Sequence, residues 1–436
     1  MEAEGLPEPD FSIEQLGERR FPSPLQRIME VRYRSDNECL LVQPEFDCRI
    51  EPDHAPAAAA TMELAGPRAQ VFFDTGRVRA AIVTCGGLCP GLNAVIRGLV
   101  MQLWYLYDCR QVLGIRFGYQ GLGNAAQESI MLTPARVSAI NGRGGTILGS
   151  SRGTPPTAEL VDNLERRGID MLFVIGGDGS MRGGTALWEE IRRRRLQIAV
   201  VGIPKTIDND IPWVRRTFGF DTAVAEAVKA INAAEVEANG MPHGIGLVKL
   251  MGRAAGFIAA TACVASGNAN ACLIPEVPFQ LEGPNGLLAL LEKRLHERNH
   301  AVVVVAEGAG QHLVAGQGTD ASGNPHLGDI GACLKQRITE HFHSRNLRCA
   351  MKYIEPSYLI RAAAPNASDQ LYCDQLARAA VHAAMAGKGG LLIGNWNGRL
   401  VHIPMQALKG RTSQVNPHGE LWFSVLENTG QPRLLD

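Results

Sequence analysis

The stretch IAVVGIPKTIDND, residues 198–210, passes from an apolar run into a dense polar segment. Residues 198–203 are rich in β-branched side chains and have the length of one buried strand. A lysine, a threonine and two aspartates follow at once, which is more polar chemistry than a surface Asx turn requires. This density at a strand end predicts a functional site.

The two carboxylates of this segment suit the activation of a hydroxyl group. A hydroxyl that attacks phosphorus needs a positioned carboxylate to accept its proton. Asp208 and Asp210 lie two residues apart, so they can serve as the base and as a metal or hydrogen-bond partner. Lys205 can offer a point charge to a phosphate group.

Apolar runs of strand length alternate with longer helical patterns in the rest of the chain. The runs are residues 78–84, 111–115, 171–175, 244–248 and 301–306. This alternation is typical of an α/β fold in which mostly parallel sheets are covered by helices. Ligands bind at the carboxyl ends of such strands, and several of these runs end in glycine, aspartate and serine.

Two of the runs end in glycine-rich loops. TCGGLCPGLN, residues 84–93, precedes a helical stretch at 94–103, and its backbone N–H groups can approach a phosphate. It matches no standard phosphate-loop motif, and a tight turn needs glycine anyway, so both interpretations stay open. In IGGDGS, residues 175–180, Asp178 among small neighbours suits a metal-bound polyphosphate better than it suits an ordinary turn.

Cationic residues follow two later runs. Arg253 in MGR is expected to open a helix at 255–264, where the helix dipole disfavours arginine and thus indicates a bound anion; a distant carboxylate partner is the alternative. Lys352, Tyr358 and Arg361 share one short segment and together suit a phosphate monoester. Strand-end placement adds three smaller candidates: Glu307, Ser151 and Arg152.

Bulk composition excludes several classes of protein. The 436 residues exceed one hydrophobic core and predict two domains. With 43 basic and 44 acidic side chains, no global field attracts nucleic acid or an anionic membrane. Ten cysteines without a secretory signal indicate reduced thiols in a cytoplasmic protein. The uncharged residues 254–275 predict a buried helix and a strand, because glycine, serine and asparagine interrupt them.

The first 77 residues differ in texture from the rest. They are rich in proline and lack periodicity, so we expect an N-terminal extension that wraps the body or a partner subunit. The four arginines at 192–195 are expected to end a helix that begins near Thr185, as a solvated helix end and not a nucleic-acid patch.

From about residue 78 to about residue 410 the chain resembles the phosphofructokinase family. The matching segments are the GG…PGLN loop at 86–93, GGDGS at 176–180, PKTIDND at 204–210 and MGR at 251–253, in the family's order. The resemblance implies two similar α/β domains. Residues 78–220, completed by 360–410, would bind the phosphate donor; 221–359 would bind fructose 6-phosphate; 1–77 would be an extension and 411–436 a tail.

The resemblance also implies roles for individual residues. Asp208 would be the base on the sugar 1-hydroxyl, with Arg253 and Thr206 also catalytic, and Asp178 and Asp210 would bear on Mg²⁺. The donor would contact Gly87, Tyr119, Arg152, Asp178, Gly179, Ser180, Gly183 and Lys205. Fructose 6-phosphate would contact Thr206, Asp208, Asp210, Met251, Gly252, Arg253, Glu307, Lys352, Tyr358 and Arg361.

The phosphate donor is decided by two residues with opposed signals. Pyrophosphate-dependent members of the family carry aspartate where this chain has Gly179, and that carboxylate would obstruct the α-phosphate of ATP. They also carry lysine at the position of Lys205. Gly179 therefore favours ATP, whereas Lys205 favours pyrophosphate. The combination resembles the long ATP-dependent enzymes of plants and trypanosomatids, so we expect an ATP-dependent 6-phosphofructokinase of glycolysis, with the pyrophosphate-dependent enzyme as the alternative.

The family completes its active sites across subunits, which implies a homodimer or homotetramer. Lys352 stands where the short bacterial enzymes use an arginine from the neighbouring subunit, and Gly244 stands where they have a second arginine. A catalytically inactive sugar-phosphate-binding subunit is a remote alternative, opposed by the intact aspartates. A dinucleotide-binding dehydrogenase is more remote still, because no strict GxGxxG is present.

Overall fold

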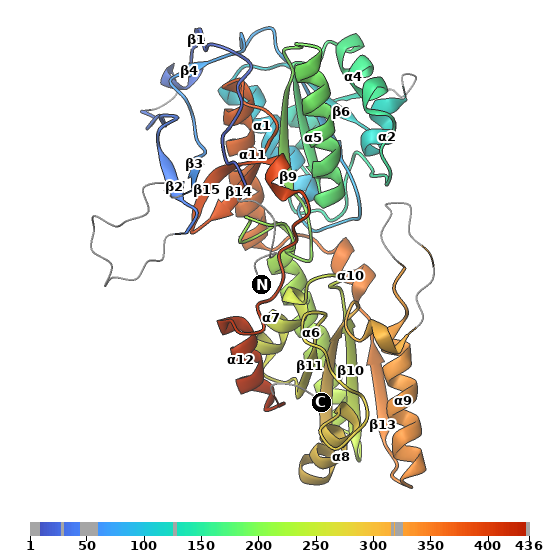
Figure 1. Cartoon of the computed structure of the whole chain (residues 1–436). Helices are drawn as coiled ribbons and strands as arrows, with labels where there is room; N and C mark the ends of the chain where they lie inside the picture. The colour runs from blue at the N-terminus through green and yellow to red at the C-terminus, as the bar shows by residue number, and fades with distance from the viewer. Residues whose placement is uncertain are drawn as a thin grey trace, which may run out of the picture.

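The computed structural model describes residues 9–27, 30–43, 60–124, 129–314, 318 and 326–432. Two separate sheets organise these residues, one in each of the two lobes that Figure 1 shows. The chain passes between the lobes more than once, because β14 and β15 return to the first sheet after the second sheet is complete. The α/β architecture expected from the alternating pattern is confirmed.

The first sheet has seven strands in the order β15-β14-β9-β8-β5-β6-β7. Its inner five strands are parallel, and the edge strands β7 and β15 are antiparallel to their neighbours. Its strands are β5 (Arg79–Thr84), β6 (Gln111–Ile115), β7 (Ser129–Met131), β8 (Met171–Gly176), β9 (Ala199–Pro204), β14 (Leu391–Trp396) and β15 (Arg399–Pro404).

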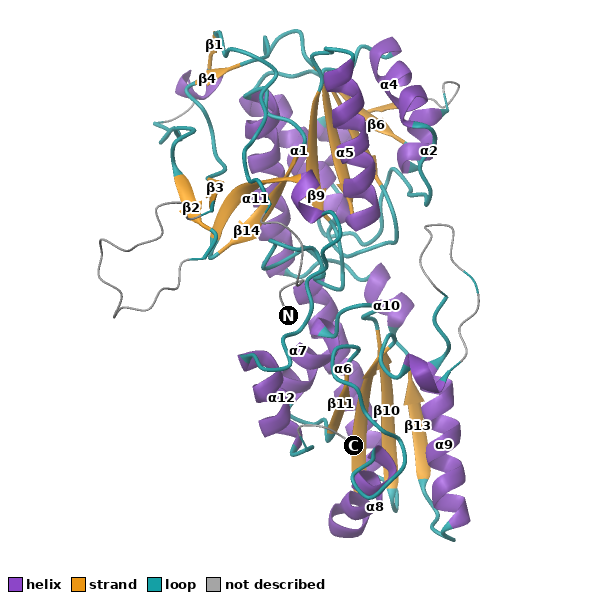
Figure 2. Ribbon diagram, in the orientation of Figure 1, coloured by secondary structure: helices purple, strands orange, loops and turns teal. Residues whose placement is uncertain are grey.

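The order of these strands places a topological switch between β5 and β8. From β5 the chain continues through α1 (Leu92–Leu106) to β6 on one side, whereas α5 (Asp178–Arg193) joins β8 to β9 on the other. Helix α5 contacts β8 and β9, and α1 packs on α11 (Ala367–Met385); Figure 2 shows α5 and the α1–α11 pair flanking the sheet. Ligands bind at the carboxyl ends of strands beside such a switch. Short helices complete this lobe: α2 (Gly118–Gly123), α3 (Pro134–Val137) and α4 (Thr157–Arg166).

The second sheet has four parallel strands in the order β11-β12-β10-β13. Its strands are β10 (Gly244–Leu250), β11 (Ala271–Leu273), β12 (His300–Ala306) and β13 (Ala350–Ile354). Its helices are α6 (Phe220–Asn239), α7 (Phe257–Ser266), α8 (Leu287–Arg298), η3 (Gln311–Leu313), α9 (Ile330–Ser344), α10 (Ser357–Ala362) and, near the C-terminus, α12 (Glu420–Thr429).

Strand alternation divides the core of this second lobe between two faces. In β12, Val302 and Val304 join the large core that also holds the first sheet, whereas Val303 and Val305 join a smaller core with α8 and α9. Successive side chains of a strand point to opposite faces, so one apolar strand serves both cores. The continuous large core fixes the two lobes to one another.

The described part of the N-terminal segment forms four short strands on the first lobe: β1 (Phe21–Pro22), β2 (Cys39–Leu41), β3 (Thr61–Glu63) and β4 (Gln70–Val71), with η1 (Pro24–Arg27) between β1 and β2. Strand β3 lies against β15. The predicted extension therefore contacts the body in residues 9–27, 30–43 and 60–77.

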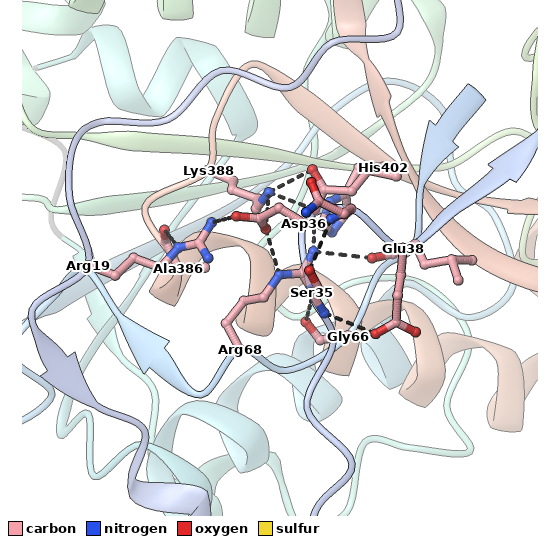
Figure 3. Close-up of polar contacts among 12 residues, drawn as sticks. Arg19, Ser35, Asp36, Glu38, Gly66, Arg68, Ala386, Lys388 and His402 are labelled. Atoms are coloured by element: carbon pink, nitrogen blue, oxygen red, sulfur yellow. Dashed lines mark hydrogen bonds and ion pairs between the residues drawn. The ribbon is translucent and has the colours of Figure 1, made fainter. Parts of the chain in front are cut away.

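A buried ionic cluster holds this segment in place, and Figure 3 shows its side chains. Lys388, which has no exposed surface, places Nζ 2.6 Å from both carboxylate oxygens of Glu63 and 2.9 Å from Asp36 Oδ1. Arg68 pairs with the same two carboxylates, and His402 Nδ1 lies 3.2 Å from Glu63 Oε1. Two acidic side chains of the N-terminal segment thus pair with a lysine that the body buries, and one of them also contacts a buried histidine.

Two predicted helix starts are wrong. Helix α5 begins at Asp178 and not near Thr185, because Gly179, Gly183 and Gly184 hide its pattern. A Cβ at Gly183 would lie 2.7 Å from the Tyr119 ring, so close packing explains one of these glycines. Arg253 lies in the loop before α7, which starts at Phe257, so the helix-dipole argument for an anion does not apply to it.

The other predictions at this level agree with the structure. The six predicted strands correspond to β5, β6, β8, β9, β10 and β12 within two residues. The uncharged stretch forms α7 and β11, and no helix among the described residues is long and apolar enough to cross a membrane. The arginine run ends α5 and pairs with Glu14, Asp162 and Glu190.

Candidate active site

A cavity of about 750 Å³ opens at the carboxyl ends of β5, β8 and β9, beside the topological switch. The second lobe closes its other side through Arg253 and Ala254 of a loop and Arg361 of α10. The segments that line it are residues 85–89, 151–154, 177–180, 205–208 and 411–412, with Tyr119, Arg182, Gly183, Ala186 and Asp210. Most of the predicted polar segments therefore meet in one place.

Asp208 lies in this cavity with a carboxylate oxygen that lacks a partner. Its Oδ1 is buried and accepts no hydrogen bond from the described residues. Burial, together with the negative charges of Asp210 and Glu307, raises the pKa of Asp208 to about 7, against the lowering effect of the hydrogen bond from the Arg253 backbone N–H. A carboxylate with a pKa near neutrality and an open acceptor site is suited to general-base chemistry.

The loop that carries Asp208 is held by its own polar side chains. The Thr206 hydroxyl donates to Asp210 Oδ1 at 2.7 Å and accepts from the Asp208 N–H at 3.2 Å. Thr217 donates its hydroxyl to the Thr206 carbonyl, and Asn209 has a φ of 57° while its Oδ1 accepts from Thr217 N–H. This network fixes the Asp210 side chain and the backbone of the loop that carries Asp208.

The glycine-rich loop after β5 forms a second wall, and Lys205 lies beneath it. Gly86 N–H donates to the Ser151 carbonyl at 3.0 Å, which joins the loop to the segment that carries Arg152. The buried ammonium of Lys205 donates to the Gly87 carbonyl at 2.7 Å, and burial lowers the pKa of Lys205. The lysine thus supports the loop, and Gly87 remains on the cavity surface.

The first turn of α5 forms a third wall. Asp178 and Gly179 are its first two residues, so unpaired backbone N–H groups and the positive end of the dipole face the cavity. A Cβ built on Gly179 would meet nothing nearer than Arg182 Nη2 at 3.7 Å, which leaves space above the helix. Tyr119 packs under this turn and donates to the Ser180 carbonyl at 2.8 Å.

The residues expected to bear on Mg²⁺ are compatible with that ion. Burial raises the pKa of Asp178, the positive charge of Arg182 lowers it, and the charge of Asp210 raises it again, so the two carboxylates are close enough to interact. Among the described residues no group of three or more histidine, cysteine or acidic side chains forms a metal site. Two carboxylates suffice for Mg²⁺ when substrate phosphates and water complete its shell.

The predicted sugar-phosphate residues are divided between the cavity and its surroundings. Arg253 and Arg361 line the cavity together with Thr206, Asp208 and Asp210. Met251, Gly252 and Glu307 are not among the lining residues. Gly252 has a φ of 131° and its carbonyl accepts from Gly308 N–H, which joins the loops after β10 and β12. The negative charge of Glu307 still raises the pKa of Asp208.

Lys352 and Tyr358 do not line the cavity of this chain. Lys352 pairs with Glu237 at 3.0 Å, and the Tyr358 side chain is 83% exposed. The phosphate-monoester grouping read from this segment is therefore only partly assembled within one chain, with Arg361 as its member in the cavity.

Sequence reasoning missed several lining residues, among them Arg182, Arg411 and Thr412. Arg182 lies one helical turn after Asp178 and pairs with it at 3.2 Å, a relation that the correct start of α5 would have revealed. Arg411 and Thr412 come from the segment that was assigned to a tail. Nothing local in the sequence distinguishes them, because only the return of the chain after β15 brings them to the cavity.

Comparison with known proteins adds relatives to this geometry. A family described as Phosphofructokinase matches residues 79–384. An ATP-dependent 6-phosphofructokinase of Amycolatopsis methanolica is 47% identical over 97% of this chain and 95% of its own length. ATP-dependent 6-phosphofructokinase 7 of Arabidopsis thaliana is 50% identical over 85% and 77%, and the Trypanosoma brucei brucei enzyme of that type is 42% identical over 96% and 87%.

Solved structures support the fold. The crystal structure of a pyrophosphate-dependent phosphofructokinase from Marinobacter aquaeolei matches with a TM-score of 0.67, over 82% of this chain and 96% of its own. Only 20% of the aligned residues are identical, so this likeness bears on the arrangement of the elements alone.

Proposed function

The chain belongs to the phosphofructokinase family, and from this premise we propose that it is an ATP-dependent 6-phosphofructokinase, which transfers the γ-phosphoryl group of ATP to the 1-hydroxyl of fructose 6-phosphate. The observation that carries the proposal is the position of Asp208, a base with an open acceptor oxygen. On one side of the cavity, the glycine-rich loop and the first turn of α5 suit phosphates; on the other side lie Arg253 and Arg361. Relatives that cover nearly the whole chain carry the same activity in their names.

Asp208 accepts the proton of the sugar hydroxyl as that hydroxyl attacks the γ-phosphorus. Its Oδ1 has no competing donor among the described residues, so the substrate hydroxyl can donate to it. With a pKa of about 7, the carboxylate is ionised in roughly half of the molecules near neutral pH and is basic enough to accept a proton in the transition state. The hydrogen bond from the Asp208 N–H to the Thr206 hydroxyl holds the backbone of the base.

The remaining groups bind and orient the two reactants. The first turn of α5 and the glycine-rich loop offer N–H groups to the donor phosphates, and Arg253 offsets the charge that develops on the transferred group. When Mg²⁺ is bound through Asp178 and Asp210, it neutralises charge on the donor phosphates. In-line transfer needs no covalent intermediate on the protein.

ATP is the donor that the surroundings of Gly179 favour. This position is open in the structure, and an α-phosphate can approach the helix there. The argument for pyrophosphate rests on Lys205, yet its ammonium donates to the Gly87 carbonyl and so has a supporting role. Pyrophosphate is the second candidate because this buried lysine still lines the cavity.

The sugar-phosphate site is completed by a second copy of the chain. Tyr358 and the neighbouring Leu359 are 83% and 78% exposed on α10, which is unusual for apolar side chains on one short helix. Arg361 of the same helix lines the cavity, so a chain docked on α10 would lie beside the bound sugar phosphate. A homodimer or homotetramer agrees with this surface. We place this oligomer in the cytoplasm.

The test is the Asp208→Asn variant in a coupled assay of fructose 1,6-bisphosphate formation. Loss of the base should lower kcat by roughly 10²–10⁴-fold, while fructose 6-phosphate still binds. Asp162→Asn, which changes an exposed aspartate of α4, is the matched control and should keep wild-type kcat. Full turnover by Asp208→Asn would overturn the assignment of the base.

A further inference from the structure

The segment between η4 (Met405–Leu408) and α12 crosses from the first lobe to the second, and it can be followed in Figure 1 from β15 to α12. Two hydrogen bonds attach it to the chemical centre. Ser413 N–H donates to the Asp210 carbonyl at 2.9 Å, and Gln414 Nε2 donates to the Ala254 carbonyl at 2.9 Å. The crossing segment is therefore joined to Asp210 itself and to the residue after Arg253.

A partly buried carboxylate anchors the far end of this segment. Glu276 Oε1 accepts from Val415 N–H at 2.8 Å, and the same carboxylate accepts from Gly256 N–H in front of α7 at 2.9 Å. Val415 is itself buried. Four residues after Arg411 the chain is thus fixed against the second lobe, which restricts where Arg411 can lie.

Arg411 lies on the donor side of the cavity. It follows η4 by three residues, and η4 packs on α5, where Met405 Sδ fills the space beside Gly184. Helix α5 is the helix whose first turn carries Asp178 and Gly179. Both Arg411 and Thr412 line the cavity wall.

Trp213 supports the Arg411 side chain from outside. The guanidinium carbon of Arg411 is 5.7 Å from the centre of the Trp213 ring. Trp213 has a φ of 63°, which is costly for a bulky residue, and its Nε1 donates to the Ala407 carbonyl at 3.2 Å. The strained tryptophan thus joins the loop after Asp210 to the turn just before Arg411.

Arg411 adds a cation to a wall that already carries several. Arg152, Arg182 and Lys205 also line the cavity; Arg182 pairs with Asp178, and the ammonium of Lys205 donates to a backbone carbonyl. A polyphosphate carries several negative charges, and a planar guanidinium can bind two of its oxygens at once. Arg411 is a lining cation that the resemblance did not supply, since it lies in the segment 411–436 that was assigned to a tail.

We propose that Arg411 is a donor-binding residue: its guanidinium binds the polyphosphate group of the phosphate donor, delivered to the site by the crossing segment 409–415. The inference deepens the proposed function and rests on it for the identity of the donor. ATP and pyrophosphate share the chemistry that Arg411 recognises, so the experiment includes both.

The experiment compares Arg411→Ala, Arg411→Lys and Lys409→Ala with the wild type. Lys409 is an exposed cation of the same segment outside the cavity and controls for the loss of one charge. We expect Arg411→Ala to raise the donor KM by about tenfold or more, with the fructose 6-phosphate KM and the Tm close to wild type. Arg411→Lys should fall between, because it keeps the charge and loses the fork.

Two results would overturn the inference. One is a donor KM of Arg411→Ala that matches Lys409→Ala; the other is an equal rise of both KM values with a lower Tm, which would mean that Arg411 only holds the segment. Equilibrium binding of Mg·ATP and of pyrophosphate to wild type and Arg411→Ala is measured as well. If the wild type turns over neither donor, the proposed function fails. The binding measurement still tests Arg411 in that case, because equal dissociation constants of wild type and Arg411→Ala would decide against it.

Discussion

At the scale of single residues, Asp208 connects burial with reactivity. The same burial that raises its pKa to about 7 leaves Oδ1 without a donor among the described residues. A group in this state is unfavourable for folding and favourable for accepting a proton. The active site thus stores a cost that the rest of the fold must offset.

The pH dependence of activity should follow this pKa. We expect kcat/KM for fructose 6-phosphate to fall as pH drops below about 7, because protonated Asp208 cannot act as a base. A pH profile at saturating donor measures this. If the protein remains folded down to pH 5 and the profile is flat over that range, the role of Asp208 is contradicted.

The pH dependence of stability should have the sign of a raised carboxylate pKa. Folding raises the pKa of Asp208 from 3.8 to about 7, so its proton is bound more tightly in the folded protein. This contribution to stability is present below pH 3.8 and is lost as pH rises to about 7. The Tm advantage of Asp208→Asn over wild type should therefore be larger at pH 8 than at pH 4, whereas a constant difference would show that folding does not shift this pKa.

Gly179 should control the donor. An aspartate there has room for its Cβ, since the nearest heavy atom is 3.7 Å away, so the fold should be kept. Its carboxylate would project over the first turn of α5 and repel an α-phosphate. We expect Gly179→Asp to raise the KM for ATP by about tenfold or more at an unchanged Tm, with Gly179→Ala as the uncharged control. Equal ATP kinetics in both variants would remove Gly179 from the donor decision.

At the scale of elements, the sequence predicted the strands better than the helix starts. The buried strands read clearly because each is a continuous apolar run, and their polar ends identified Asp178, Asp208 and Arg253. The start of α5 was missed because glycine is a poor helix former. Glycine is needed at position 183 because the Tyr119 ring packs there, and no local pattern in the sequence shows that contact. Arg411 was missed because only the path of the chain after β15 brings it to the cavity, and no local pattern shows that path either.

The two kinds of glycine in α5 should respond differently to alanine. At Gly183 a new Cβ would lie 2.7 Å from the buried Tyr119 ring, and overpacking of this kind costs about 1–3 kcal/mol. At Gly179 the added methyl meets open space, so stability should be unchanged or slightly higher. Urea unfolding of both variants measures the difference. Similar stabilities would show that Tyr119 does not restrict this helix.

At the scale of the whole molecule, the N-terminal segment is part of the folded body. Burial pushes the pKa of Glu63 up, but the hydrogen bond from His402 and the charge of Lys388 outweigh it and hold that pKa at about 2. Because a lowered carboxylate pKa stabilises the fold above the unfolded value of 4.5, the cluster holds at neutral pH and weakens only as pH falls toward 2.

Breaking this cluster should release the segment. Glu63→Gln removes one of the two carboxylates that pair with Lys388 and Arg68, so the two buried cations keep only Asp36, and breaking a buried pair costs about 3–5 kcal/mol. Denaturant unfolding should show this loss, and limited proteolysis should cut the N-terminal segment faster. Glu18→Gln, which alters an exposed pair with Arg20, is the control and should change stability by less than about 1 kcal/mol. Equal stabilities of the two variants would mean that the cluster does not hold the segment.

The central claim, that this fold uses ATP to phosphorylate fructose 6-phosphate, is tested most directly by one assay. Fructose 1,6-bisphosphate formation is followed with Mg²⁺ and either ATP or pyrophosphate, side by side, on the same wild-type protein. We predict turnover with ATP and none with pyrophosphate. Turnover with pyrophosphate alone would contradict the account and would place the choice of donor with Lys205.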